Sequence, residues 1–229
     1  MFGASWGSND LIVFGGHEGG GLWQVSAAGG MAKQLTMLDL KRGEVSHRLP
    51  QVLPGNQAVI FTVTRTILPT WDDTDVVVQS LTTGERKTLI EGAADARYVP
   101  TGHLAYVRRG TLMAVAFDLQ HLTVSGGAVT VISDLMQSAN MTNNAFDSGE
   151  GQFGISDSGS LAYVQGGMFT FPERLLVWVS RSGRVERLPA PPRAYIVPRL
   201  SPDGKQVLVS TQGDRNVWVY DMSRGTTSR

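Results

Sequence analysis

Five times along its 229 residues, the chain repeats a polar turn followed by an alternating apolar run. The turns are rich in Pro, Asp, Asn and Gly, whose backbone preferences suit tight turns. The runs alternate in the manner of half-buried β-strands. Intervals of 46, 47, 57 and 45 residues separate the copies, which are centred on Asn9, Gly55, Gly102, Gly159 and Gly204. A regular period of this kind indicates a fold built from similar consecutive units.

Each copy is followed by further short strand-like segments, so that one unit reads as four strands. A period near 45 residues is typical of the four-stranded blade of a β-propeller. A β-sandwich is the less favoured alternative, because its strands would not repeat as a four-strand block. The sequence therefore predicts one all-β domain, a β-propeller of about five four-stranded antiparallel blades, at residues 1–42, 43–92, 93–134, 150–190 and 191–229, with a polar insert at 135–149.

Three of the five tryptophans occupy the same strand in different units. They are Trp23, Trp178 and Trp218. A buried indole ring removes a large apolar area from water. We expect these three rings to wedge between neighbouring blades.

Charge and cysteine content exclude several classes of protein. Twenty basic residues balance twenty acidic ones, so no strong field favours nucleic acid or an anionic membrane surface. The absence of cysteine excludes disulfides, thiolate zinc sites and a cysteine nucleophile. No apolar run approaches the roughly 20 residues that cross a bilayer. We expect no nucleic-acid partner and no membrane-embedded segment.

Four longer motifs carry a family resemblance. Residues 44–55 read EVSHRLPQVLPG, residues 110–118 GTLMAVAFD, residues 176–183 LVWVSRSG and residues 201–205 SPDGK. Together they resemble the TolB-like (WD40-like, PD40) propellers attached to bacterial serine/threonine protein kinases. The SPDGK motif alone indicates only the propeller fold, whereas the four motifs together are more specific for this family.

The resemblance implies a periplasmic or extracellular location in the parent protein. Propellers of that family usually carry six or more blades. The chain begins on an innermost strand and stops near the place of a last outer strand, which favours a truncated piece of a larger propeller. A closed five-bladed ring is the alternative. A piece would have unpaired blade edges, so we expect homo-oligomers to form through them.

The innermost strands of a propeller converge on a central channel, and polar residues on them are the best candidates for a ligand site. Mapping the repeat nominates Glu44, His47, Arg48, Asp95, Arg97, Gln152, Tyr195 and Arg199. These side chains could bind a small polar ligand or a protein, or they could only neutralise each other as ion pairs. His47 could act as a general base, but no positioned nucleophile accompanies it.

Other candidate motifs are weak. Ser5 lies in a G-x-S-x-G pattern at residues 3–7, but a nucleophile elbow needs a preceding strand and a following helix. His17 and Glu18 lie in a glycine-rich loop without the second histidine of a zinc motif. The acidic loop at 72–75 lacks the spacing of an EF-hand. We therefore expect no catalytic residue, no metal ligand and no cofactor.

Two classes of function stay open. The first is a non-catalytic interaction or ligand-sensing propeller, the sensor or docking part of a bacterial membrane signalling protein; its kinase link rests on resemblance. The alternative is a propeller hydrolase, either a metal-dependent lactonase or the accessory propeller of a prolyl-oligopeptidase-like peptidase. A lactonase would need several carboxylates at matched innermost positions, and only Glu44 and Asp95 are candidates.

Overall fold

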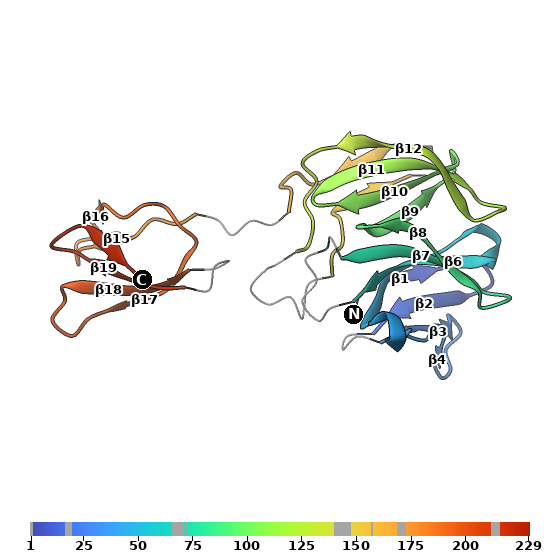
Figure 1. The fold of residues 1–229 in the computed structure, drawn as a ribbon, viewed down its shortest axis with the longest axis horizontal. Coiled ribbons are helices and arrows are strands. Elements are labelled where there is room, and N and C mark those ends of the chain that lie inside the picture. The colour runs from blue at the N-terminus through green and yellow to red at the C-terminus, as the bar shows by residue number, and fades with distance from the viewer. Residues whose placement is uncertain are drawn as a thin grey trace. The chain divides into compact units, whose positions relative to one another are not determined.

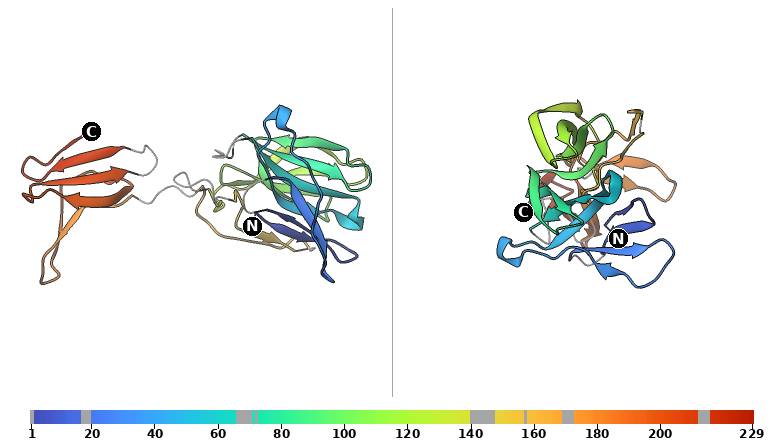
Figure 2. Two further views of the ribbon diagram at one scale, coloured as in Figure 1. Left: turned by 90° about the horizontal axis from the view of Figure 1, so that it is seen from below. Right: turned by 90° about the vertical axis from the view of Figure 1, so that its right-hand side faces the viewer.

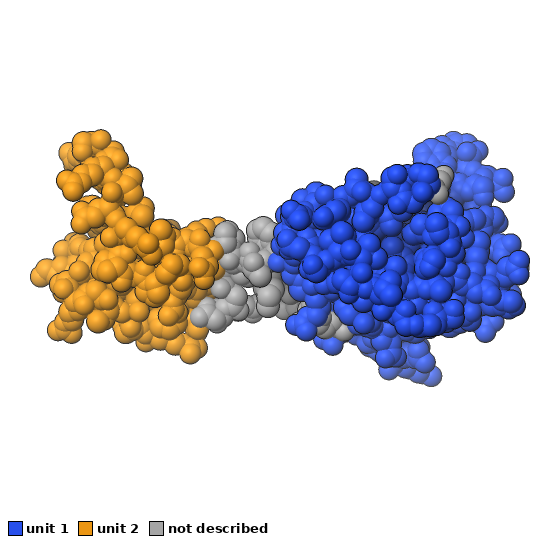
Figure 3. Space-filling view, turned by 90° about the horizontal axis from the view of Figure 1, so that it is seen from above, with its two compact units in different colours: residues 1–139, 143–169 blue, residues 140–142, 170–229 orange. Residues whose placement is uncertain are grey.

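The computed structural model describes residues 2–16, 20–65, 71, 73–139, 148–156, 158–168, 173–211 and 216–229. In this part of the chain the regular elements are β-strands and two short 3₁₀ helices, η1 (Leu40–Arg42) and η2 (Pro54–Asn56). The chain forms two compact units (Figure 3). Unit 1 is Met1–Ala139 with Asn143–Phe169, and unit 2 is Asn140–Thr142 with Thr170–Arg229.

Unit 1 contains three antiparallel four-stranded sheets, each made of consecutive strands (Figure 1). The first has β1 (Ala4–Trp6), β2 (Leu11–Gly15), β3 (Leu22–Ser26) and β4 (Lys33–Gln34). The second has β5 (Ser46–Val52), β6 (Ala58–Thr64), β7 (Thr74–Ser80) and β8 (Arg86–Glu91). The third has β9 (Ala94–Val99), β10 (His103–Arg108), β11 (Thr111–Asp118) and β12 (Thr123–Ile132). Spatial order follows chain order in each sheet, as it does in a propeller blade.

The sheets of unit 1 pack on one another through apolar side chains, and Figure 2 shows them from two further directions. Strand β5 lies against β1 and β2, and β9 lies against β5 and β6. Val13 and Phe61 are buried in one core cluster, and Ile60 and Tyr106 in another. Successive strand residues point to opposite faces, so β6 supplies both clusters. Each such side chain contributes about 1.5–3 kcal/mol on full burial.

The rest of unit 1 is a two-stranded sheet, β13 (Phe153–Ile155) with β14 (Leu161–Tyr163). Phe153 is buried with Val107 and Leu112 of the third sheet. In unit 2, β15 (Val177–Val179) pairs with β16 (Val185–Arg187). A four-stranded sheet follows, with β17 (Tyr195–Leu200), β18 (Gln206–Thr211), β19 (Val217–Asp221) and β20 (Thr226–Ser228).

A β-bulge recurs in the first strand of three sheets. One extra residue lies between two pairs with the next strand, at residues 48–51 in β5, 94–97 in β9 and 196–199 in β17. Each bulge contains a residue with positive φ, 51° at Leu49, 48° at Asp95 and 50° at Val197. A bulge bends its strand and changes where the side chains point. The three strands therefore have the same local geometry, and in each the residue with positive φ lies five residues before a turn proline, at 54, 100 or 202.

The four-stranded units predicted at residues 1–42, 43–92, 93–134 and 191–229 each contain one four-stranded sheet. The strands expected at 150–190 form two separate two-stranded sheets, one in each unit, and their union in one blade stays a prediction. The short strand β20 supplies the outer strand that we expected to be missing near residue 229.

The expectation for the tryptophans is wrong for Trp23, whose exposed fraction is 37%. Its neighbour Leu22 is fully buried instead, because alternate residues of β3 point to opposite faces. Trp178 is also half-exposed within its unit. Within the described residues, no helix is long and apolar enough to cross a membrane.

Candidate functional site

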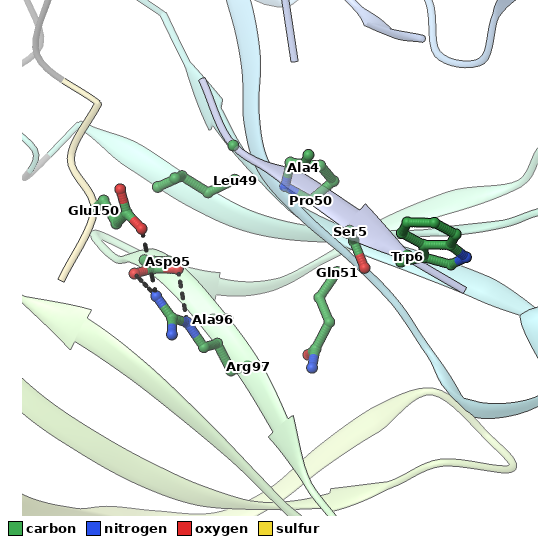
Figure 4. A pocket seen from close by; sticks show the side chains of 11 residues that line it. Ala4, Ser5, Trp6, Leu49, Pro50, Gln51, Asp95, Ala96, Arg97 and Glu150 are labelled. Atoms are coloured by element: carbon green, nitrogen blue, oxygen red, sulfur yellow. Dashed lines mark hydrogen bonds and ion pairs between the residues drawn. The ribbon is translucent and has the colours of Figure 1, made fainter. Parts of the chain in front are cut away.

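A cavity of ≈ 400 Å³ lies in unit 1 where three innermost strands meet (Figure 4). Its lining comes from β1, β5 and β9, with one contribution from the segment before β13. The lining residues are Gly3, Ala4, Ser5, Trp6, Leu49, Pro50, Gln51, Asp95, Ala96, Arg97 and Glu150. The volume is within the range of small-molecule sites.

The charged groups of this cavity are Asp95, Arg97 and Glu150. Asp95 occupies the bulge of β9 and is 3% exposed. Arg97 donates from Nη2 to Asp95 Oδ2 at 2.9 Å and from Nε to Asp95 Oδ1 at 3.3 Å. The Gly151 backbone N–H also donates to Asp95 Oδ2, at 2.8 Å. The buried carboxylate is therefore paired and hydrogen-bonded, which offsets the cost of its desolvation.

Arg97 connects this pair to the segment around β13. Its Nη1 donates to the Phe153 carbonyl at 2.6 Å, and its guanidinium carbon lies 4.1 Å from the centre of the Phe153 ring. Glu150 Oε1 lies 3.9 Å from Arg97 Nη2. Burial raises the pKa of Glu150, and the negative charge of Asp95 raises it further, while Arg97 opposes both effects. The negative charge of Glu150 is thus less well compensated by neighbouring groups than that of Asp95.

The remaining polar lining is bound to backbone groups. Ser5 Oγ accepts a hydrogen bond from the Val52 N–H at 2.9 Å. Gln51 Oε1 accepts one from the Tyr98 N–H at 2.5 Å. Trp6 differs, because 69% of its surface is exposed. The cavity thus combines a closed ion pair, a less compensated carboxylate and an open indole.

Glu44 and His47 form a second polar cluster, which does not contribute to the cavity lining. His47 is 1% exposed, and its ring centre is 4.7 Å from that of Phe61. His47 Nε2 lies 3.0 Å from Glu44 Oε2, and its Nδ1 lies 2.7 Å from Thr36 Oγ1. Arg86 Nη2 donates to Glu44 Oε1 at 3.1 Å. The motif at 44–55 therefore joins the second sheet to the loop after the first.

The contacts of His47 favour one tautomer, although Arg86 Nη1 also lies 3.4 Å from His47 Nε2. Thr36 Oγ1 accepts from the Leu22 N–H at 2.7 Å, so its own proton is available for His47 Nδ1. We assign the imidazole proton to Nε2, where it donates to Glu44. Burial lowers the pKa of His47, although Glu44 acts to raise it. Burial alone would raise the pKa of Glu44, but hydrogen bonds from the Asp39 backbone and His47, with the charge of Arg86, hold it below its usual value.

The other nominated residues lie apart from the cavity lining. Arg48 is buried, with its guanidinium carbon 3.7 Å from the centre of the Phe2 ring. Gln152 is exposed. In unit 2, Tyr195 donates its hydroxyl to the Pro191 carbonyl at 2.8 Å, and Arg199 is exposed on β17. Of the eight nominated residues, unit 1 brings two together at the cavity, Asp95 and Arg97.

The weaker motifs have simple structural roles where they are described. Ser5 is the only hydroxyl side chain among the described residues of the lining, and it is bound to a backbone N–H. Asp75 forms an ion pair with Arg65. Residues 17–19 and residue 72 lie outside the described residues. Among those that are described, no group of three or more His, Asp or Glu side chains is placed to hold a metal ion.

Sequence reasoning missed three residues of these clusters. Glu150 directly follows the polar insert at 135–149, where no repeat could place it beside β9. Thr36 follows a two-residue strand, and Arg86 begins an outer strand. A charged residue near a strand end carries no signal for a contact 42 residues away, as between Arg86 and Glu44.

Comparison with known proteins supports the fold. No family model matches the chain, and no curated protein matches its sequence. Among solved structures, XC5397 of Xanthomonas campestris, described as a gluconolactonase, has a TM-score of 0.52 and 12% identity, over 95% of this chain and 70% of that one. A structure of a nidogen/laminin complex has a TM-score of 0.50 and 12% identity, over 100% of this chain and 78% of that one. The fold is that of a β-propeller.

TolB of Acinetobacter baumannii is also similar, with 16% identity and a TM-score of 0.46. The match covers 98% of this chain and 52% of TolB, so this chain spans about half the length of that protein. The all-β propeller class predicted from the repeats is confirmed. At sequence identities this low, structural similarity shows only a shared fold, and function has to be argued from the site.

Proposed function

We propose that the chain is a non-catalytic interaction or ligand-sensing propeller, and that the cavity of unit 1 is its binding site. The observation that carries this proposal is the convergence of β1, β5 and β9 on one polar cavity. The charged pair there is held by hydrogen bonds, and the hydroxyl of Ser5 is bound to a backbone N–H. A partly polar cavity with no activated nucleophile among its described lining residues suits binding better than catalysis.

The parent protein in this proposal is a bacterial membrane signalling protein, with a serine/threonine kinase as its other part. Support comes from the motif at residues 44–55, whose Glu44 and His47 build the buried network behind β5. These motif residues therefore have a structural role in this chain, which agrees with the family resemblance. The propeller would act outside the cytoplasm and present its cavity to a small polar ligand or a protein.

We also propose self-association through an unpaired sheet edge. Strand β12 is the outermost strand of the third sheet, and its ten residues include no charged residue and no proline. Val129 is 61% exposed and Val131 44%. The outer strand β8 carries Arg86, Lys87 and Glu91 instead. Charges, bulges and short length normally protect an edge from pairing. The pairing of β12 with β11 has two irregularities, but β12 is long and uncharged, so we choose it as the edge that pairs with a second copy.

The hydrolase alternative is tested directly. Purified protein is incubated with p-nitrophenyl acetate and with glucono-δ-lactone, with and without Ca²⁺. We expect rates equal to those of the Asp95→Asn variant and of buffer. A rate that is above buffer and falls in Asp95→Asn would overturn the non-catalytic proposal.

Binding at the cavity is tested by NMR. ¹⁵N-labelled protein is titrated with mixtures of amines, sugars and carboxylates, and shifts are expected to cluster on Ser5, Gln51 and Glu150. No shift from any mixture, or shifts confined to unit 2, would contradict the assignment of the site to this cavity.

A further inference from the structure

The ion pair of Asp95 and Arg97 has few hydrogen-bonding groups left to bind a ligand. Arg97 donates to both oxygens of Asp95 and to the Phe153 carbonyl, with a longer contact of 3.5 Å from Nη2 to the Gly151 carbonyl. Asp95 accepts from the Gly151 N–H in addition. A guanidinium binds an anionic ligand through its two-pronged edge, and here Asp95 already occupies that edge. The pair is therefore closed and close to neutral.

Glu150 adds a negative charge to the cavity that the Asp95–Arg97 pair does not neutralise. Its side chain is 47% exposed, and its Oε1 is 3.9 Å from Arg97 Nη2, beyond hydrogen-bond distance. Among the described residues, the lining contains two carboxylates and one cation, so their formal charge is −1 when both carboxylates are ionised. An incoming anion would meet this excess of negative charge, whereas an incoming cation would be attracted by it.

Trp6 provides the second recognition element. It lines the same cavity from β1 and is 69% exposed. Figure 4 shows Glu150 and Trp6 on opposite sides of the cavity, with Leu49 and Pro50 between them. An indole face attracts cations more strongly than the other aromatic rings, and a partly apolar lining suits an alkyl chain.

We propose that the cavity binds a small organic cation, an alkylammonium group whose nitrogen pairs with Glu150 while its chain or a second amine covers Trp6. This inference rests on the proposed function of the cavity as a binding site. The same chemistry is present in a free diamine and in the lysine side chain of a protein partner.

Calorimetric titration of the whole chain with cadaverine tests the charge requirement. The neutral and anionic controls of matched length are 1,5-pentanediol and glutarate. We expect cadaverine to bind and both controls to fail, and the affinity to weaken with added salt. Equal binding of the diol, or tighter binding of glutarate, would overturn the proposal.

Two variants locate the site. Glu150→Gln keeps the shape of the side chain and removes its charge, and it should weaken cadaverine binding about tenfold. Trp6→Ala should weaken it about threefold to tenfold. Glu85→Gln is the matched control, since Glu85 is an exposed carboxylate of a turn outside the lining, and it should leave the affinity unchanged. An unchanged affinity in Glu150→Gln would refute the role of Glu150.

A third titration separates the two sources of the cation. N-acetyl-lysine-methylamide represents a protein lysine, and tighter binding of this compound than of cadaverine would favour a protein partner. If sugars shift the cavity resonances in the NMR experiment and amines do not, the cavity is a binding site but this inference fails. If no compound shifts them, both proposals fail.

Discussion

Thr36, in the loop after the first sheet, lies 2.7 Å from His47 on the innermost strand of the second, measured from Oγ1 to Nδ1. Both side chains are almost completely buried, at 1% exposure. Thr36 also accepts a hydrogen bond from the Leu22 N–H, and His47 in the assigned tautomer donates one to Glu44. One hydroxyl thus completes a chain of hydrogen bonds from the first sheet to the second. Buried polar chains of this kind are stabilising only when every member has its partner.

Replacing Thr36 by Val should destabilise unit 1. The change keeps the shape of the side chain but leaves the Leu22 N–H and His47 Nδ1 without their partner, which costs about 1–3 kcal/mol. Thr101→Val is the matched control, because Thr101 lies 3.1 Å from His103 in an equivalent but exposed pair. That variant should change stability by less than about 0.5 kcal/mol. Urea denaturation followed by circular dichroism measures both, and equal losses would contradict the role of the buried pair.

The stability of unit 1 should decrease as the pH falls below about 6.5. The ordinary pKa of histidine is 6.5, and burial lowers that of His47 in the folded state, with Glu44, Arg86 and Thr36 around the ring. The unfolded chain therefore takes up a proton first, and the stabilisation present above pH 6.5 is lost progressively below it. Measurement between pH 7.5 and 5.5 stays above the range in which Glu44 titrates.

Variants of histidine check the origin of this pH dependence. His47→Asn should flatten the plot of unfolding free energy against pH, whatever its absolute stability. His103→Asn, at an exposed ring, should retain the slope of the parent protein. A parent protein with constant stability from pH 7.5 to 5.5 would show that His47 is not held neutral.

The repeat made most of the fold predictable. Pro and Gly turns at fixed intervals marked the strand boundaries, and each of the four clear copies coincides with one four-stranded sheet. The unit at 150–190 was harder to predict, because it follows the polar insert and its short strands β13 to β16 hold few core residues. Periodicity shows that strands are present, but the partner of each strand depends on distant contacts.

The candidate site was predictable only where its residues share a strand. Asp95 and Arg97 are two positions apart on β9, so the sequence predicted them on one side of a regular strand, and they are paired although Asp95 lies in the bulge. His47 was expected at the channel; its ring is buried and contacts that of Phe61, and its place at a channel stays a prediction. The bulge after Arg48 was not foreseeable, since Leu and Val are poor residues for positive φ and gave no signal at 49 or 197. Glu150 reaches Arg97 from 53 positions away along the sequence.

Val197 offers a test of the recurrent bulge. It has φ of 50° and is 54% exposed, a strained conformation for a β-branched residue with little burial to offset it. Val197→Asn should stabilise unit 2 by about 0.5–1 kcal/mol, because Asn tolerates this conformation. Val217→Asn, at an exposed valine of β19, should instead destabilise by up to about 1 kcal/mol. Hydrogen exchange of β17 and β18 measures both, and a loss of protection in Val197→Asn would argue against strain.

Strand β12 gives the last prediction, which concerns self-association. Two copies that pair through β12 would place Val129 and Val131 near their counterparts, so the double variant Val129→Lys/Val131→Lys should bring like charges together and separate the copies. We expect sedimentation equilibrium to show a concentration-dependent dimer for the parent protein and a monomer for this variant. Val185→Lys, at a 62% exposed valine of β16 beside Glu186 and Arg187, should still dimerise. A monomeric parent protein, or a double variant that dimerises unchanged, would show that β12 is not the contact.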